Sequence, residues 1–225
     1  MKGFYIAMTI LFLWTFTLGY LLFFYTISWT NPLTYFFVLL QTHLYTGMFI
    51  TAHDAMHSIV CPNKRINNAV GWIFAGLFAF NYYKTLHQKH HLHHRFVATD
   101  QDPDYYRGGF WIWYYNFAKQ YITIWQVLLM AISYNLLILV FPVTNVILYW
   151  ILPSVLSTFQ LFYFGTYLPH KGEHNNKHYS HSQAKNHWLA FMTCYFFGYH
   201  YEHHHSPATP WWLLWKEKEK NYLHK

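Results

Sequence analysis

The residues with the clearest chemistry in this chain are histidines in three short patterns. His53 and His57 are four residues apart in HDAMH. Two further patterns have the spacing H-x-x-H-H and consist of His90, His93, His94 and of His200, His203, His204. Residues three or four apart share one face of a helix, so each pattern should present its imidazoles together. Eight imidazoles are too many for one ion, and neutral imidazole suits Fe, Cu, Ni or Zn, so the spacing predicts a two-metal redox site.

Other histidines extend these patterns or compete with them. His170, which follows a long apolar segment, is a ninth candidate ligand. His87 and His91 create a competing frame, because HQKHH is itself H-x-x-H-H. His43 lies inside an apolar segment, where an ionisable residue is a functional candidate by default, but it is nearly three helical turns before His53. A polar loop carries four more histidines, most of them expected to be solvated, although one could also bind metal: His174, His178, His181 and His187.

Acidic residues near these histidines are candidates for supporting the ligands. Metal-bound histidines usually donate their second ring N–H to a carboxylate or a carbonyl. Asp54 and Glu202 are embedded in the patterns, so we favour them over Asp102 and Asp104, which lie nearby. No carboxylate has the spacing of a direct ligand, which argues against a soluble di-iron bundle of the glutamate type.

The composition is that of a membrane protein with one domain, residues 1–225. Hydrophobic residues make up 54% of the chain and charged residues only 10%, which is far from a soluble composition. A helix needs about 20 apolar residues to cross a bilayer. Pro153 should kink the last of the candidate crossings, because proline removes a helical hydrogen bond. The four candidate transmembrane segments are residues 4–27, 33–52, 125–141 and 143–168.

Three shorter apolar segments should lie in the membrane interface: 66–86, 110–121 and 188–199. Segment 66–86 joins His57 to His90, which must reach the same centre, so it should lie along the membrane or dip in and return. Segment 188–199 is too short to cross. Tryptophan and tyrosine, which are abundant in segment 110–121, favour the headgroup level.

The basic residues give an independent indication of topology. All 15 lysine and arginine residues fall on the side of the predicted hairpins that carries the histidines. The positive-inside rule then places both termini and the metal site in the cytoplasm. We therefore predict an all-α membrane protein with about four transmembrane helices in two hairpins, interfacial helices and a cytoplasmic histidine-rich metal cap. The net charge of +7 is explained by membrane-proximal residues, so no nucleic-acid partner is expected.

The three patterns resemble the histidine boxes of the membrane fatty-acid desaturase and hydroxylase superfamily, whose members hold two irons with eight or more histidines. Longer strings are similar to the bacterial β-carotene 4-ketolases, and the resemblance covers residues 41–212. It favours the frame that begins at His90 over the one at His87. Ser58 and Tyr201 depart from the ketolase pattern, which leaves open the preference between unsubstituted and hydroxylated rings. The strings are QTHLYTGMFITAHDAMH (41–57), ATDQDPDY (98–105), FGTYLPH (164–170) and YHYEHHHSPATPWW (199–212).

The resemblance implies an O₂-dependent di-iron oxygenase that forms a ketone at carbon 4 of the β-ionone rings of β-carotene-type carotenoids. The ring methylene would be hydroxylated twice and then lose water, giving echinenone, canthaxanthin or astaxanthin. An apolar C–H has no acidic proton, so a metal–oxygen oxidant is needed, and the cofactor carries that chemistry. The implied ligands of the two Fe ions are His53, His57, His90, His93, His94, His170, His200, His203 and His204.

The partners follow from the same resemblance. A carotenoid resides in the bilayer among membrane lipids, so a site at the membrane face lets it enter sideways. The chain has no flavin, nicotinamide or haem motif, and its two cysteines, Cys61 and Cys194, are too scattered for a cysteine-based site. Electrons are therefore expected from an external donor such as ferredoxin, which would dock on the basic cytoplasmic surface.

Two alternative functions fit parts of the sequence. A fatty-acyl or alkane desaturase or hydroxylase of the same superfamily would keep the metal site and change the substrate. A histidine-rich metal transporter or sensor fits less well, because transport needs polar groups across the bilayer and three of the four predicted crossings contain no histidine. The oligomeric state and the pairing of histidines with each iron stay open.

Overall fold

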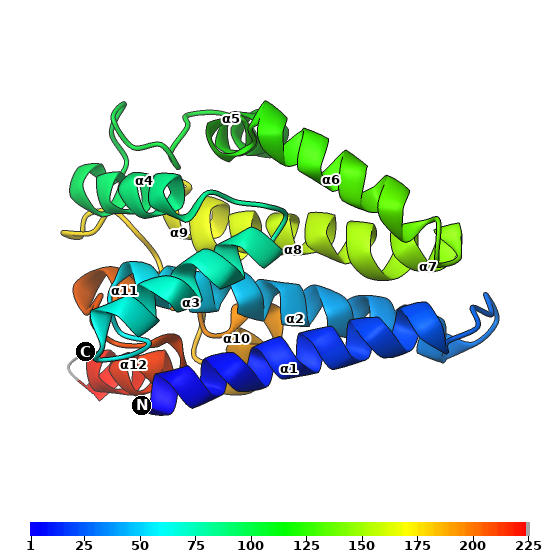
Figure 1. The fold of residues 1–225 in the computed structure, drawn as a ribbon. Coiled ribbons are helices and arrows are strands. Elements are labelled where there is room, and N and C mark those ends of the chain that lie inside the picture. The colour runs from blue at the N-terminus through cyan, green and yellow to red at the C-terminus, as the bar shows by residue number, and fades with distance from the viewer. Residues whose placement is uncertain (224–225) are drawn as a thin grey trace.

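The computed structural model describes residues 1–223, with side chains up to residue 220, and this part of the chain forms helices and no strand. The described chain has three long helical rods, which are α1, α2 and a third rod, Val143–His170, that contains α8. In Figure 1, α2 lies between α1 and the third rod. Helices α3, α4, α11 and α12 gather around one end of the rods, whereas α6 runs along them to α7 at the opposite end. Their bounds are α1 Lys2–Phe23, α2 Pro32–Met56, α3 Lys64–Leu77, α4 Tyr83–Phe96, α5 Phe110–Tyr121, α6 Ile124–Leu137, α7 Val143–Val146, α8 Leu152–Phe162, α9 Leu168–His170, α10 His187–Cys194, α11 His200–His205 and α12 Leu214–Leu223.

Three helices of the described chain are long and apolar enough to cross a bilayer: Lys2–Phe23, Pro32–Met56 and Val143–His170. The fourth expected crossing, residues 125–141, corresponds to α6, an apolar helix of 14 residues. At 1.5 Å per residue, such a helix covers about 21 Å, which is less than the hydrocarbon thickness of about 30 Å. The sequence pattern predicts the apolar character of this segment correctly but overestimates its helical length.

Local sequence signals fix the ends of α2, which carries the first histidine pattern. Asn31 caps the helix by accepting a hydrogen bond from the backbone N–H of Leu33 at 3.0 Å, and Pro32 occupies the first turn. The helix ends at Met56, so His53 lies in its last turn and His57 is the residue that caps it. Both histidines are therefore presented at one end of a long apolar rod.

The third rod contains two π-helical turns, η1 Ile147–Ile151 and η2 Tyr163–Tyr167, and each turn is followed directly by a leucine and a proline. The N–H of Leu152, the residue before Pro153, bonds to the carbonyl of Ile147, and Leu168 before Pro169 bonds to Tyr163 in the same way. Because proline has no N–H to donate, the widened turn lets the helix continue past it. The kink expected at Pro153 stays a prediction, and the change in hydrogen bonding is local to the turn before it.

The segments expected at the interface form short helices around the rods. Segment 66–86 is not one helix, because α3 ends at Leu77 and α4 begins at Tyr83. Between them the chain reverses through Ala79 and Phe80, which both have positive φ. Segment 110–121 coincides with α5, and segment 188–199 contains the short helix α10.

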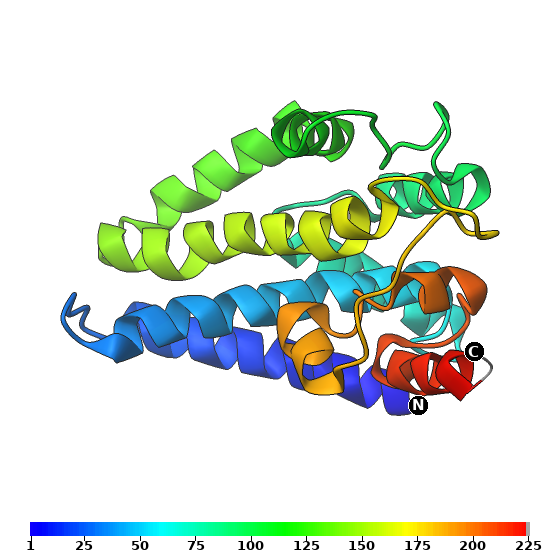
Figure 2. The ribbon, with the colours of Figure 1, turned by 180° about the vertical axis from the view of Figure 1, so that it is seen from behind.

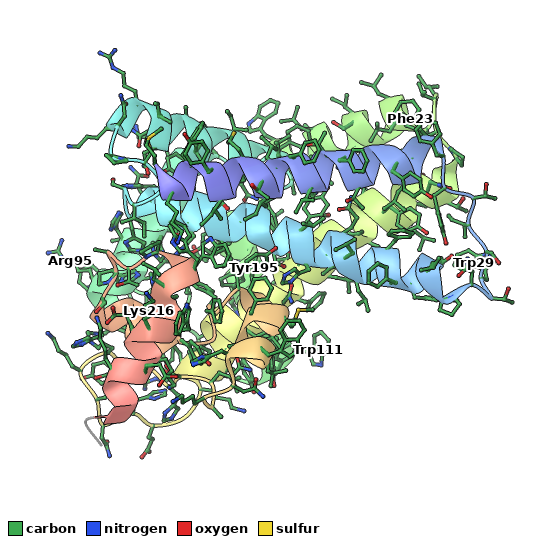
Figure 3. The ribbon with its side chains drawn as sticks, turned by 90° about the horizontal axis from the view of Figure 1, so that it is seen from below. Phe23, Trp29, Arg95, Trp111, Tyr195 and Lys216 are labelled. Carbon is green, nitrogen blue, oxygen red and sulfur yellow. The ribbon has the colours of Figure 1, made fainter. Side chains whose placement is uncertain are left out.

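Both chain ends and the histidine-bearing helices α4, α9 and α11 lie at the same end of the rods, as the front and rear views show (Figures 1 and 2). In Figure 3, Arg95 and Lys216 mark this end, whereas Phe23 and Trp29 mark the opposite one. The core between the rods is apolar and includes Met48 of α2, Phe74 of α3 and Leu161 of α8, all buried. The fold therefore delivers every histidine pattern to one end of an apolar bundle.

At the opposite end, Asn145 joins the third rod to the end of α1. Its side-chain amide donates to the carbonyls of Leu21 at 2.7 Å and Tyr25 at 2.8 Å, and Asn145 is buried. Replacing Asn145 with alanine should lower the free energy of unfolding by about 1–3 kcal/mol, because a buried carbonyl loses its donor. Thermal unfolding in detergent measures this change.

The matched control for Asn145 is Asn135→Ala. Asn135 is an exposed residue whose amide bonds only to the carbonyl of Ala131 in its own helix. This substitution should change the free energy of unfolding by no more than about 0.5 kcal/mol. Equal losses of stability in the two variants would contradict the role given to Asn145.

Candidate metal centre and adjoining cavity

The nine histidines implied as ligands meet in two groups, in each of which the candidate ligand atoms all lie within 4.8 Å of one another. We call these groups cluster A and cluster B. Each draws on α4 and α11 and on the end of one long rod. Cluster A consists of His53, His57, His90, His94 and His203, and cluster B consists of His93, His170, His200 and His204.

The two H-x-x-H-H patterns are each divided between the clusters. On α4, His94 belongs to cluster A and His93 to cluster B. Adjacent residues on a helix point about 100° apart, so neighbouring histidines reach different centres. The expectation that each pattern presents its imidazoles together is confirmed for His53 and His57 but is wrong for the two H-x-x-H-H patterns, because α4 and α11 lie between the clusters and contribute to both. The ring of His94 stacks on that of His204 with centroids 4.2 Å apart, so the clusters are contiguous.

The ring nitrogens converge in the way that a shared ion requires. The Nε2 atoms of His57 and His90 are 2.7 Å apart in cluster A. In cluster B the Nε2 atom of His200 lies 2.9 Å from those of both His170 and His204. Nitrogens bonded at about 2 Å to one ion are separated by about 3–4 Å, so modest outward movement of the rings would make room for it.

Asp102 is the carboxylate that supports a cluster histidine most directly. His93 Nδ1 lies 2.9 and 3.0 Å from the two oxygens of Asp102. The same carboxylate accepts hydrogen bonds from the backbone N–H groups of Ala98 and Asp104. With Nδ1 donating to Asp102, the Nε2 lone pair of His93 faces cluster B. His170 follows the same arrangement, because its Nδ1 lies 2.9 Å from the carbonyl oxygen of Tyr179.

The two acids favoured from the sequence make other contacts. Asp54 accepts a hydrogen bond from the backbone N–H of Trp211, and its oxygen is 3.6 Å from His53 Nδ1, too far for a hydrogen bond. Glu202 accepts hydrogen bonds from Ser182 and from Lys218 of α12. Both carboxylates thus tie cluster-bearing helices to other parts of the chain, and their roles in metal binding stay predictions.

Asp102 was one of four nearby acids in the sequence, but its position nine residues after His93 follows no helical spacing. The turn that returns it to His93 includes Ala98, which has a φ of 59°. Only the local turn signal TDQDPD indicated that the chain reverses here.

Burial favours the neutral form of the cluster histidines on α4 and α11 other than His93, and the neutral form is the one that binds metal. Burial lowers the pKa of His203 and His204 well below the usual value, and neighbouring histidines lower it further. Burial followed by the charges of His93 and His57 lowers the pKa of His94 to about 2. His93 differs: burial lowers its pKa, but the hydrogen bond and charge of Asp102 outweigh burial and raise it.

His53 tests whether the residues fit a metal ion. It is buried, and within the described chain neither of its ring nitrogens has a hydrogen-bond partner. Leaving a buried polar group unsatisfied costs about 1–3 kcal/mol. A cation in cluster A would satisfy such a nitrogen, and an all-imidazole donor set suits iron and other late first-row metals. The clusters therefore fit the metal site predicted from the sequence.

The other histidines among the described residues lie outside the clusters. His43 stacks on Tyr195 inside the bundle, with ring centroids 4.2 Å apart. His87 and His91 pack against each other on α4, and His91 Nε2 is 3.3 Å from the carbonyl oxygen of Met56. The structure thus places His90, His93 and His94 in the clusters, whereas His87 and His91 of the competing frame lie outside them. The loop histidines His174, His178 and His181 are also outside both clusters.

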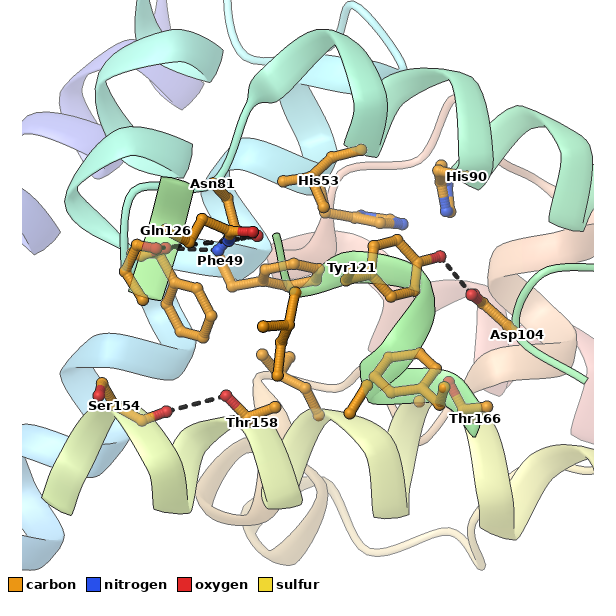
Figure 4. Close-up of a pocket in the computed structure, with 18 of the residues that line it drawn as sticks. Phe49, His53, Asn81, His90, Asp104, Tyr121, Gln126, Ser154, Thr158 and Thr166 are labelled. Atoms are coloured by element: carbon orange, nitrogen blue, oxygen red, sulfur yellow. Dashed lines mark hydrogen bonds between the residues drawn. The ribbon is translucent and has the colours of Figure 1, made fainter. Parts of the chain in front are cut away.

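A cavity of about 460 Å³ adjoins the clusters and runs between α2, α5, α6 and the third rod. His53 and His90 of cluster A and His93 and His200 of cluster B all line it, so both clusters face the same space. The other lining side chains are mostly apolar. Figure 4 shows His53 and His90 on one wall, with Ser154, Thr158 and Thr166 of the third rod opposite. This arrangement suits an apolar substrate positioned beside a metal pair.

Polar residues close the ends of the cavity. Gln126 donates to the side-chain oxygen of Asn81 at 2.9 Å, which holds α6 against the reversal between α3 and α4. Near the clusters, the hydroxyl of Tyr121 donates to the carboxylate of Asp104. Trp113 Nε1 donates to the backbone carbonyl of Asp104 at 2.7 Å, so α5 is fixed to the loop after α4 at both of its ends.

The model of the family described as "Fatty acid desaturase" matches residues 27–124 and 111–221, which together make up most of the chain. The chain belongs to the fatty acid desaturase family. Its relatives in this family include a zeaxanthin 4-ketolase of Chlamydomonas reinhardtii, 37% identical over 94% of this chain and 52% of the relative. A β-carotene ketolase of Haematococcus lacustris is 38% identical over 79% of this chain and 59% of the relative.

A β-carotene ketolase of a Paracoccus species is 38% identical over 77% of this chain and 74% of the relative. The chain spans about half the length of the algal relatives and about three quarters of the bacterial one. No solved structure matches it. Membership of the desaturase family and the two histidine clusters were both expected from the histidine patterns.

Replacing Asp102 with asparagine tests its support of cluster B. The substitution removes the charge that accepts from His93 Nδ1 and should weaken metal binding by about 10- to 100-fold. The measurement is the iron that the purified desaturase-family protein retains during dialysis against increasing chelator concentrations. Asp100→Asn is the control, because Asp100 lies in the same turn but is exposed. Equal iron retention in both variants would show that Asp102 does not support the centre.

Proposed function

We propose that this protein is an O₂-dependent di-iron oxygenase that introduces keto groups at carbon 4 of the β-ionone rings of carotenoids. The observation that carries the proposal is that both histidine clusters line one apolar cavity in a chain similar to β-carotene ketolases. The nine cluster histidines would hold the two irons. Bound iron would supply the oxidation by O₂ of an allylic C–H bond that has no acidic proton for a side chain to remove.

The residues of the chain position the substrate and keep the ligands in the binding form. The mostly apolar cavity would place an apolar ring beside histidines of both clusters. Asp102 and the Tyr179 carbonyl fix the rings of His93 and His170 so that Nε2 is available to metal. Hydroxylation of the ring methylene twice at carbon 4 gives a gem-diol, which loses water to form the ketone.

The substrate and the electron donor would reach the site from different directions. A carotenoid would enter from the bilayer, because α5 and α6 border the cavity and present exposed apolar side chains such as Trp111 and Leu136. The basic end of the bundle, marked by Arg95 and Lys216 in Figure 3, suits an acidic donor of the ferredoxin type. The proposal places this end, both termini and the metal centre in the cytoplasm.

The assay uses two bacterial hosts, one accumulating β-carotene and one accumulating its dihydroxy derivative zeaxanthin. Expression of the chain should convert the carotenoid to 4-keto products with red-shifted absorption, identified by chromatography and mass. His93→Ala, which removes a predicted ligand, should abolish conversion while the protein still inserts into the membrane. Unchanged carotenoids together with altered acyl lipids would contradict the ketolase proposal and favour a fatty-acyl oxidase of the same family.

Gly165 controls the position of a cavity-lining ring. A Cβ at Gly165 would lie 2.4 Å from the ring of Phe197, and Phe197 packs against His53 and His200 with centroids 4.8 and 5.4 Å apart. Gly165→Ala should therefore move this ring and lower the rate of ketone formation by about tenfold or more, since small displacements beside a reacting centre are costly. The rate of product accumulation per folded protein measures the effect.

Gly19→Ala is the matched control for Gly165. A Cβ at Gly19 in α1 would meet no atom within 4 Å. Its conversion rate should equal that of the wild type. A Gly165→Ala variant that is equally active would show that the Phe197 ring has room to move without consequence.

A further inference from the structure

A pair of histidines outside the two clusters lies directly beside cluster B. His178 comes from the loop between α9 and α10, and His205 is the last residue of α11. Their ring centroids are 5.7 Å apart, and the His178 ring is 6.2 Å from that of His204. The pair is therefore next to a predicted ligand without belonging to either cluster.

Solvent exposure decreases from His205 through His178 to His204. His205 is exposed, His178 is half-buried and His204 is buried. All four members of cluster B are buried, whereas cluster A includes the half-buried His57 and His94. Cluster A is thus partly open to solvent at His57 and His94, whereas the ligands of cluster B are all buried, with the half-buried His178 beside one of them.

The geometry of the pair suits a metal ion. Its centroid separation of 5.7 Å equals that between His170 and His204, which both belong to cluster B. The Nε2 atom of His178 is buried and has no hydrogen-bond partner among the described residues. Tyr201 contacts both rings, at centroid distances of 5.4 Å to His178 and 6.1 Å to His205, and so helps to orient them.

We propose that His178 and His205 form an outer metal site that captures a divalent iron ion and passes it to cluster B. Two imidazoles with water completing the coordination would hold a late first-row cation less tightly than the four buried imidazoles of cluster B. The ion would therefore move inward as it exchanges His178 and His205 for His204 and its neighbours. This inference rests on the proposed di-iron function.

The experiment measures iron uptake by the full-length protein in detergent. Iron is removed with a chelator, Fe²⁺ is added without oxygen, and samples are quenched with excess chelator before the retained iron is measured. His178→Gln and His205→Gln should slow uptake about tenfold, because the outer site raises the effective concentration of iron beside cluster B. The final iron content and the activity per bound iron should match those of the wild type. Circular dichroism and size-exclusion chromatography verify folding.

His181→Ala is the matched control, since His181 is an exposed histidine of the same loop whose ring packs on His174. It should take up iron at the wild-type rate. Wild-type rates in the His178 and His205 variants, or equal slowing in His181→Ala, would overturn the outer site. A wild-type protein that retained no iron would overturn the di-iron function as well, so the two failures are distinguishable.

Discussion

Nine imidazoles meet at one end of the bundle, seven of them buried, and the whole fold has to accommodate them there. The rings come from α2, α4, α9 and α11, which are separated by long stretches of sequence. Only elements that end at the same membrane face can meet in this way. Two of the three long rods, α2 and the third rod, supply His53 and His170 at their ends. The short helices α4 and α11 contribute the histidines between them. The apolar bundle is thus a support for a polar site at its edge.

Carboxylates connect this site to the rest of the chain. Asp104, in the loop after α4, fixes α5 at both ends, and α5 lines the cavity. Glu202 of α11 accepts from Lys218 of α12, so the terminal helix holds the last histidine pattern in place. Asp54 of α2 accepts from the backbone of Trp211. Each of these contacts links a helix that carries cluster ligands to an element that carries none.

The apolar segments predicted the all-helical fold, the three histidine patterns indicated the family, and the resemblance of longer strings implied the nine histidines that cluster. The sequence could not show which histidines belong to which cluster. That assignment depends on how α4 and α11 face each other in the fold. Asp102 was also undervalued, since its contact with His93 depends on a turn rather than on periodicity. The length of α6 was overestimated because hydropathy does not reveal where a helix ends.

The π turn at residues 163–167 has a consequence for the length of the chain. A π turn holds one more residue than an α-helical turn does, so the helix after it continues in nearly the phase of an uninterrupted α-helix. Deleting one residue there would restore an α-helical turn and leave His170 near its present direction. Deleting a second residue, or inserting one, would rotate His170 by about 100° and shift it by about 1.5 Å along the axis, away from cluster B. The π turn therefore makes this segment tolerant of the loss of one residue but not of two.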